Sequence, residues 1–185
     1  RQAGHPGLRM ITLVASLALL GPSAPVQAAL LDLPPLDKVL NYQPKVDSLT
    51  HRVVAFEALV RWRHPSLGLL APESFIALAE ETGMIRDIGR VVLNEAGRQL
   101  GIWQRAYRTT EPAFVAVNLS SSQLIEPSLL DDVKQIINRE GLLRGSLKIE
   151  VTESLVMQYP ERAVQILERF QELGVGLSCD DFGTG

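Results

Sequence analysis

The sequence is poor in the residues that build disulfides and zinc sites. Cys179 is the only cysteine among 185 residues, which excludes an internal disulfide and any cysteine-rich zinc site. Because Cys179 sits in an apolar run, a small buried thiol is a better interpretation than a nucleophile. The three histidines, His5, His51 and His64, show no spacing typical of metal ligands, and we expect surface or packing roles for them.

Aromatic residues and excess positive charge are also scarce. Aromatics make up 5% of the chain, too few for a platform on which single-stranded nucleic acid stacks. The formal net charge is −3, so no DNA or RNA polymer is expected as a partner, and an anionic ligand would need local arginines or a metal ion. The content of 46% hydrophobic and 21% charged residues is typical of a soluble globular domain rather than of extended disorder.

The first 29 residues have the pattern of a targeting segment. Arg9 precedes an apolar run over 11–20, and small residues follow it, as in a secretory signal peptide. The run is too short for a comfortable membrane span and is soon broken by glycine and proline. Two alternatives stay open: Met10 is the true start, or the segment is a remnant of an upstream region. Residues 1–29 are therefore excluded from the predicted fold.

From residue 30 onward the sequence alternates between strand and helix patterns. Residues 30–38 contain two consecutive prolines and are expected to be a linker, and residues 39–185 form the candidate domain. Strands are expected over 39–47, 53–57, 113–118, 147–150 and 175–179, and helices over 72–83, 88–107, 126–140 and 160–173. This alternation predicts an α/β fold built from parallel βαβ units.

Hard oxygen donors follow the apolar runs at four places: Glu57, Asn118, Glu150, and the pair Asp180 and Asp181. Because parallel strands point the same way, these groups should gather at the sheet edge where α/β folds place their active sites. Carboxylates gathered there repel one another, and a divalent cation relieves the repulsion. Oxygen-only ligands favour magnesium, manganese or calcium over zinc. Each residue alone is more commonly a turn or capping residue, and their recurrence is what favours metal chemistry.

Three details refine this candidate site. Asp180 and Asp181 are adjacent at the end of a strand, where both can reach separate ions about 3.5–4 Å apart. Arg61 follows Glu57 by four residues and suits a phosphate group, although a salt bridge at the rim is the simpler interpretation of that stretch alone. Glu153 lies three residues past Glu150, and we expect it to hold a loop rather than to bind metal.

With these residues in view, the sequence resembles the EAL domain, the bacterial phosphodiesterase module that hydrolyses the second messenger cyclic di-GMP. The matching segments occur in the family's order from about residue 41 to the end of the sequence. They are Tyr42–Asp47, Glu57–Pro65, Leu78–Gly83, Val117–Ser120, Glu150–Ser154 and Asp180–Gly185. Together these segments are highly specific, whereas the tripeptide Glu-Ala-Leu alone carries no information.

The resemblance implies a TIM-like (β/α) barrel that cleaves one phosphodiester of cyclic di-GMP to give linear pGpG, with Mg2+ or Mn2+ as cofactor. It implies metal ligands at Glu57, Asn118, Glu150, Asp180 and Asp181, and catalytic roles for Glu57, Asp180 and Asp181. By the same resemblance Arg61 would contact a substrate phosphate, Gln43 and Leu59 would line the nucleotide site, and Glu153 would steady the loop after the fifth strand.

The family domain continues beyond the segment that matches Asp180–Gly185 and supplies a lysine and a further glutamate ligand there. We therefore expect 39–185 to be a partial EAL domain, with about five of the eight strands of a barrel, and the isolated chain to lack turnover. An enzyme-type domain is the leading interpretation. A non-catalytic cyclic di-GMP receptor or regulatory interaction module is the alternative.

The resemblance also implies a place in bacterial second-messenger signalling. Cyclic di-GMP is made and destroyed in the cytoplasm, so we expect a cytoplasmic domain, free or at the inner membrane. Export is the alternative if the segment 1–29 is a functional signal. A homodimer and an upstream sensory or membrane domain are both compatible with the family.

Overall fold

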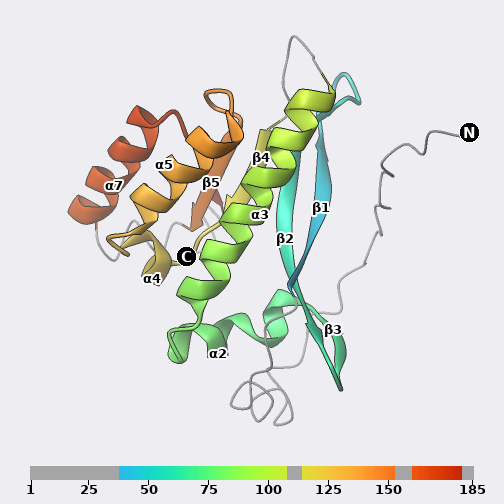
Figure 1. The fold of residues 1–185 in the computed structure, drawn as a ribbon, viewed down its shortest axis with the longest axis vertical. Helices are drawn as coiled ribbons and strands as arrows, with labels where there is room; N and C mark the ends of the chain where they lie inside the picture. The colour runs from blue at the N-terminus through green and yellow to red at the C-terminus, as the bar shows by residue number, and fades with distance from the viewer. Residues whose placement is uncertain (1–37, 108–113, 153–159, 181–185) are drawn as a thin grey trace, which may run out of the picture.

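One mixed sheet organises the computed structural model (Figure 1). The structure describes residues 38–107, 114–152 and 160–180. The signal-like segment expected over 1–29 and nearly all of the linker expected over 30–38 lie outside the described residues. Two predicted site residues, Glu153 and Asp181, also lie outside them.

The strands of the sheet are β1 (Lys38–Val46), β2 (Val53–His64), β3 (Gly68–Leu70), β4 (Phe114–Asn118), β5 (Leu147–Thr152) and β6 (Gly176–Asp180). Their order is β1-β2-β4-β5-β6, and the short β3 pairs with β2 outside that path. β1 and β3 run antiparallel to β2, whereas β2, β4, β5 and β6 are parallel. The predicted α/β fold is confirmed, and the described strands form an open sheet, as expected for an incomplete barrel.

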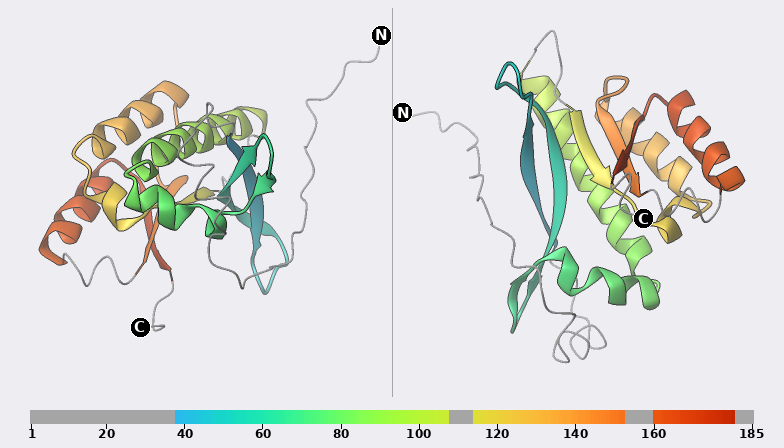
Figure 2. Two further views of the ribbon diagram at one scale, coloured as in Figure 1. Left: turned by 90° about the horizontal axis from the view of Figure 1, so that it is seen from below. Right: turned by 180° about the vertical axis from the view of Figure 1, so that it is seen from behind.

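The connections between the parallel strands carry helices that cover one face of the sheet (Figure 2). α3 (Ile85–Ala106) joins β2 to β4, α5 (Leu129–Glu140) joins β4 to β5, and α7 (Pro160–Glu172) joins β5 to β6. Three short elements complete the connections: the 3-10 helix η1 (Pro72–Ser74), α2 (Ile76–Glu81) and α4 (Ser121–Leu124). No helix in the described ranges combines the length and apolar character that a bilayer crossing needs.

The second strand is longer than predicted, and the predicted end at Glu57 is wrong. β2 continues to His64. Ala58 and Trp62 lie on the same face of the strand and are 4% and 1% exposed, so this part of the strand packs on the core. β1 pairs with β2 along this extension, and β3 pairs with its end. Glu57 therefore lies within the strand rather than at its end.

Smaller differences concern the starts of helices. The prediction of one helix from residue 126 is wrong, because α4 comes first and α5 begins only at Leu129. α4 is held by Gln123, whose Oε1 accepts a hydrogen bond from the Ser120 backbone N–H at 2.8 Å. α3 begins three residues before the predicted Ile88. The predicted stop at Gly141 is confirmed, since this residue caps α5 in the left-handed conformation with φ +65°.

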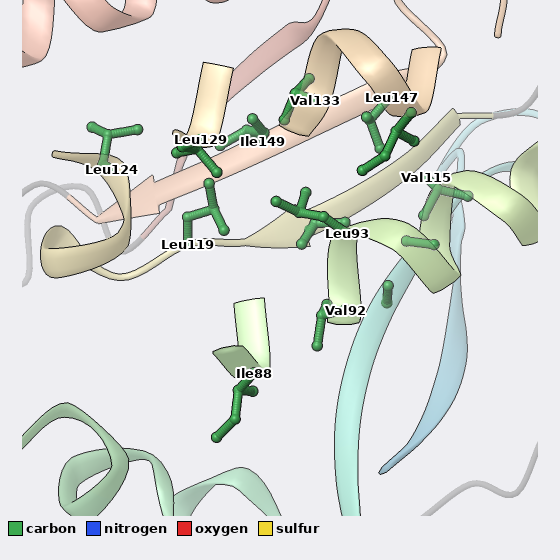
Figure 3. Close-up of a cluster of buried hydrophobic side chains, with 14 of the residues drawn as sticks. Ile88, Val92, Leu93, Val115, Leu119, Leu124, Leu129, Val133, Leu147 and Ile149 are labelled. Carbon is green, nitrogen blue, oxygen red and sulfur yellow. The ribbon is translucent and has the colours of Figure 1, made fainter. Parts of the chain in front are cut away.

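The hydrophobic core fills the space between the helices and the sheet (Figure 3). α3 contributes Leu93, β4 contributes Val115 and β5 contributes Ile149, and these three side chains are fully buried. Burial of one such side chain stabilises the folded state by about 1.5–3 kcal/mol. The strands are thus fixed from the helix side, and their opposite face is available for polar residues.

Glycines on α3 allow this helix to lie close to α4 and α5. Gly89, Gly97 and Gly101 are all buried. A methyl group added at Gly89 would overlap the Gln123 side chain, and one added at Gly97 would overlap Cγ2 of Ile136. The helices therefore approach more closely than any larger residue at these positions would permit.

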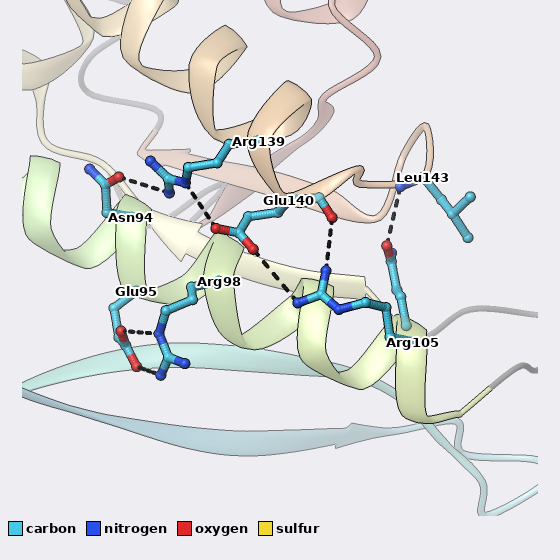
Figure 4. Close-up of polar contacts among 8 residues, drawn as sticks. Asn94, Glu95, Arg98, Arg105, Arg139, Glu140 and Leu143 are labelled. Atoms are coloured by element: carbon cyan, nitrogen blue, oxygen red, sulfur yellow. Dashed lines mark hydrogen bonds and ion pairs between the residues drawn. The ribbon is translucent and has the colours of Figure 1, made fainter.

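Hydrogen bonds and ion pairs among Asn94, Arg105, Arg139 and Glu140 join α3 to α5 at the solvent side of this contact (Figure 4), and we call these residues the polar fringe. Glu140 accepts from Arg139 at 2.9 Å and lies 3.8 Å from the Arg105 guanidinium. Arg139 also donates to Oδ1 of Asn94 at 3.1 Å. Because the arginines are half exposed, we assign this fringe a contribution of less than about 1 kcal/mol per pair. The buried apolar contact carries most of the stability.

Gly97→Ala tests the close approach of the helices. Alanine is the better helix former by about 1 kcal/mol, but the overlap with Ile136 is severe and costs about 2–3 kcal/mol. We expect a net loss of about 1–2 kcal/mol in the free energy of unfolding, measured by urea titration. Val91→Ala, at an exposed position of the same helix, is the control and should change stability by less than about 0.5 kcal/mol. A Gly97→Ala variant as stable as wild type would contradict the packing argument.

Candidate active site

The strand pairing places the predicted site residues of β1, β2, β4 and β5 on the face of the sheet away from α3, α5 and α7. Gln43 pairs with Glu57, and Asn118 pairs with Glu150. Glu57 pairs with Ala116, which shares a face with Asn118 two residues later. Directly paired residues and residues two apart point to the same side of a sheet. We call this side the polar face.

Three oxygen-bearing side chains meet on the polar face and form what we call the oxygen cluster: Glu57, Asn118 and Glu150. Nδ2 of Asn118 donates a hydrogen bond to Oε1 of Glu57 at 2.7 Å. Glu150 lies beside Asn118 in the strand register. Of the three residues only Asn118 ends its strand, so a shared face and the strand register, rather than the strand ends, bring the side chains together.

Lys45, which was not predicted as a site residue, contacts two members of the oxygen cluster. Nζ of Lys45 donates to Oε1 of Glu150 at 2.6 Å and lies 3.6 Å from Oε2 of Glu57. β1 presents Lys45 on the polar face, two residues after Gln43. That two-residue spacing within the predicted strand 39–47 was the available signal, but it identifies a face and not a partner.

Glu150 is the most enclosed member of the cluster. The residue is 5% exposed, and its Oε2 atom is buried and accepts no hydrogen bond from the described residues. A buried carboxylate oxygen without a partner is destabilising by about 1–3 kcal/mol. Such an oxygen fits the coordination of a cation better than a purely structural role.

The donor chemistry of the cluster suits a hard divalent cation, because two carboxylates and one amide offer oxygen ligands alone. Across the described ranges no group of three or more histidine, cysteine, aspartate or glutamate side chains is arranged to hold a metal ion. Asp180 is the last residue of β6, where its backbone pairs with Thr152 of β5. The predicted ligand Asp181 lies outside the described residues, so the cluster is one part of the predicted ligand set.

The other predicted residues of β1 and β2 lie on the polar face, and among the described side chains they show no hydrogen bond or ion pair with the oxygen cluster. Arg61 donates from Nη1 to the carbonyl oxygen of Val60 at 2.8 Å, so its guanidinium folds back on its own strand. Leu59 is half-buried and Gln43 is exposed. Their predicted roles toward a nucleotide therefore stay predictions.

The opposite face of β1 serves packing. The Tyr42 ring meets Trp103 of α3 edge-on at 5.0 Å, and its hydroxyl donates to the carbonyl oxygen of Glu95 at 3.4 Å. Burial, with a smaller effect of the Glu95 carboxylate, raises the pKa of Tyr42 far above its ordinary value. Tyr42 therefore stays neutral and anchors β1, the strand that carries Lys45, to α3.

The turn between β1 and β2 is closed by Asp47. Its Oδ1 accepts from the backbone N–H and the hydroxyl of Thr50, both at 2.7 Å. These hydrogen bonds favour the charged form and lower the pKa of Asp47. The stabilisation is therefore present above the ordinary carboxyl pKa and is lost as the pH falls through the lowered value. The turn helps to fix the register that aligns Lys45 with the cluster.

His64, one of the histidines expected to have a packing role, ends β2. The residue is buried, and its ring meets Trp62 edge-on at 4.8 Å. The backbone N–H groups of Ser66 and Leu67 each donate to its Nδ1 at 3.2 Å. These contacts close the turn into β3, and His64 faces the core rather than the oxygen cluster.

Asn118→Asp tests the electrostatics of the oxygen cluster. The substitution removes the amide donor to Glu57 and adds a like charge beside it. We expect chelator-treated protein to lose about 1 kcal/mol in the free energy of unfolding, measured by urea titration in EDTA. Asn94→Asp is the matched control, because it also loses an amide donor, here to the carbonyl oxygen of Arg90, but places its new charge beside Arg139 rather than beside a carboxylate. Equal effects of the two substitutions would contradict the assigned repulsion.

Comparisons with known proteins identify a matching family and similar sequences and structures. The model of the EAL domain family matches residues 37–185. In Pseudomonas aeruginosa, the bifunctional diguanylate cyclase/cyclic di-GMP phosphodiesterase MucR is 44% identical over 147 residues, which cover 80% of this chain and 21% of MucR. The cyclic di-GMP phosphodiesterase NbdA of the same species is 45% identical over 146 residues, covering 79% of this chain and 18% of NbdA.

A solved structure described as the MucR phosphodiesterase in complex with c-di-GMP superposes with a TM-score of 0.75 at 43% identity. It covers 80% of this chain and 59% of the solved chain. The chain thus spans about a fifth of the curated relatives' length and somewhat more than half of that solved structure. The described sheet corresponds to part of a TIM-like barrel of the EAL type.

Proposed function

This chain belongs to the EAL domain family, and on that premise we propose that its polar face acts in the divalent-metal hydrolysis of cyclic di-GMP to linear pGpG. The observation that carries the proposal is the oxygen cluster. Glu57, Asn118 and Glu150 come from three adjacent parallel strands and lie on the face that the helices leave open. The names of the relatives MucR and NbdA and the cyclic di-GMP complex of MucR support the choice of substrate.

The cation in this proposal is Mg2+ or Mn2+. EAL phosphodiesterases generally use divalent metals, and the buried, unsatisfied Oε2 of Glu150 fits such a ligand. Glu57, Asn118 and Glu150 would hold it together with Asp180 and Asp181. When bound, a divalent cation lowers the pKa of a water molecule and neutralises charge on a phosphodiester.

The residues of β1 and β2 would bind and orient the substrate. The oxygen cluster contains two carboxylates and would repel a phosphodiester, so positive groups on the same face are needed. Arg61 can supply one by exchanging its bond to the Val60 carbonyl for a charge-assisted bond to a phosphate oxygen. Leu59 and Gln43 would line the nucleotide site beside it, and the reaction would take place in the cytoplasm.

Glu150→Gln tests the metal site. Manganese at about 100 times its Kd should stabilise wild-type protein by about 2.7 kcal/mol, which raises Tm by about 5–10 °C above that of EDTA-treated protein. The substitution should remove most of this rise, because it replaces the most enclosed ligand. Glu140→Gln is the matched control, since Glu140 is also paired with arginines and mostly buried but lies at the end of α5. A manganese shift that survives Glu150→Gln would contradict the ligand assignment.

Arg61→Gln tests the substrate assignment separately from the metal. We expect cyclic di-GMP to bind at least about tenfold more weakly, because one charge-assisted hydrogen bond to phosphate is lost, while the manganese shift in Tm stays unchanged. Binding is measured by titration calorimetry in the presence of Mn2+, with Arg90→Gln on the exposed face of α3 as the control. Unchanged cyclic di-GMP affinity in Arg61→Gln would count against a phosphate contact.

Chromatography of the reaction mixture separates the enzyme from the receptor. Formation of pGpG that requires Mg2+ or Mn2+ would support hydrolysis by this chain and contradict the expected lack of turnover in the isolated chain. Saturable binding of cyclic di-GMP without pGpG is the result expected both for a partial enzyme domain and for the receptor alternative. A chain that neither binds nor cleaves cyclic di-GMP would refute both functions.

A further inference from the structure

Lys45 occupies the middle of the oxygen cluster, where the proposed function places a divalent cation. Its ammonium lies 2.6 Å from Oε1 of Glu150 and 3.6 Å from Oε2 of Glu57, and it thus connects side chains from β2 and β5. Both distances fall within the range of an ion pair. We propose that Lys45 is an internal counter-cation that competes with the divalent metal for Glu57 and Glu150. This inference rests on the proposed function.

The competition follows from the atoms that are shared. Glu57 uses Oε1 for Asn118 and directs Oε2 toward Lys45, and Glu150 uses Oε1 for Lys45. A cation that binds both carboxylates needs at least one oxygen of Glu57 that Asn118 or Lys45 already contacts, and its charge would lie close to the Lys45 ammonium, so the two cations compete for this site. Only Oε2 of Glu150 is left over among the described contacts, and one oxygen alone cannot hold a hard divalent ion.

In the metal-free protein the Lys45 ammonium neutralises part of the charge of Glu57 and Glu150. Its three donors and compact charge can satisfy two carboxylates at once, whereas an arginine fork would favour a single one. Without a positive charge between them, the repulsion between Glu57 and Glu150 would destabilise the pairing of β2, β4 and β5. Lys45 therefore keeps the ligands aligned before metal arrives and acts as a positioning residue.

The exchange of ammonium for metal is also feasible for the side chain. Lys45 lies on β1, at the edge of the described sheet, and its side chain is 37% exposed. A lysine with a flexible four-carbon stem can move its charge into water without disturbing the strand. The observed metal affinity then depends on how much more strongly the carboxylates bind the metal than the Lys45 ammonium. Lys45 therefore lowers the metal affinity.

Lys45→Met tests the competition in the full chain. The methionine keeps an unbranched side chain and removes the charge, so Mn2+ should bind about tenfold more tightly in titration calorimetry of EDTA-treated, dialysed protein. The Tm of the same protein in EDTA should fall, because Glu57 and Glu150 lose their common partner. Lys45→Gln replaces the charge with a neutral polar group. It should also raise the Mn2+ affinity and lower the Tm in EDTA.

Two controls separate competition from general charge. Lys45→Arg keeps the charge, although its fork favours one carboxylate, so it should raise the Mn2+ affinity by less than Lys45→Met does. Lys148→Met removes a lysine of β5 whose ammonium lies 3.3 Å from the centre of the Phe114 ring, and it should leave the affinity within about threefold of wild type.

The results distinguish this inference from the proposed function. Wild-type binding of Mn2+ with unchanged or weaker binding in Lys45→Met would overturn the competition and leave the metal site standing. An equal gain in Lys148→Met would also overturn it, because the effect would then be one of net charge. Absence of Mn2+ binding in wild type and in both neutral Lys45 variants would refute the competition and the metal site together.

Discussion

Carboxylates held together away from bulk water need a positive charge among them, and the polar face of this sheet is built around that requirement. Glu57 and Glu150 come from strands separated by β4, and their side chains share the ammonium of Lys45. Asn118, on the strand between them, donates to Glu57 and so reduces the repulsion further. The same need for positive charge explains why the cluster suits a divalent cation.

Each of the central strands places alternate side chains in the hydrophobic core and on the polar face. Alternate residues of β4 and β5 point to opposite faces, so Val117 and Ile149 join the core while Asn118 and Glu150 join the oxygen cluster. The packing side is fixed by helices whose close contact depends on glycines such as Gly97. The positions of the polar side chains therefore depend on contacts made on the other side of the sheet.

The sequence sufficed to predict the fold class and the polar residues of the cluster, because both follow from local patterns. Apolar runs followed by Asn118 and Glu150 mark strands and donors directly. The length of β2 could not be predicted as well, because a charged residue such as Glu57 interrupts an apolar run without ending the strand. Lys45 was missed as a site residue because its partner Glu150 is 105 residues away, and only the strand register brings them together. α4 depends on the buried Gln123, whose hydrogen bond to the Ile85 carbonyl is likewise a tertiary contact.

The alternation along β4 and β5 has a consequence for misfolded forms of the domain. A shift of β5 by one residue against β4 would place Ile149 beside Asn118 and turn Glu150 toward Leu93 and its neighbours. A one-residue slip therefore cannot move the ligands out of line without also burying Glu150 in the core. Cellular quality control recognises exposed apolar surface. It would therefore also remove the molecules whose site residues are misaligned by such a slip.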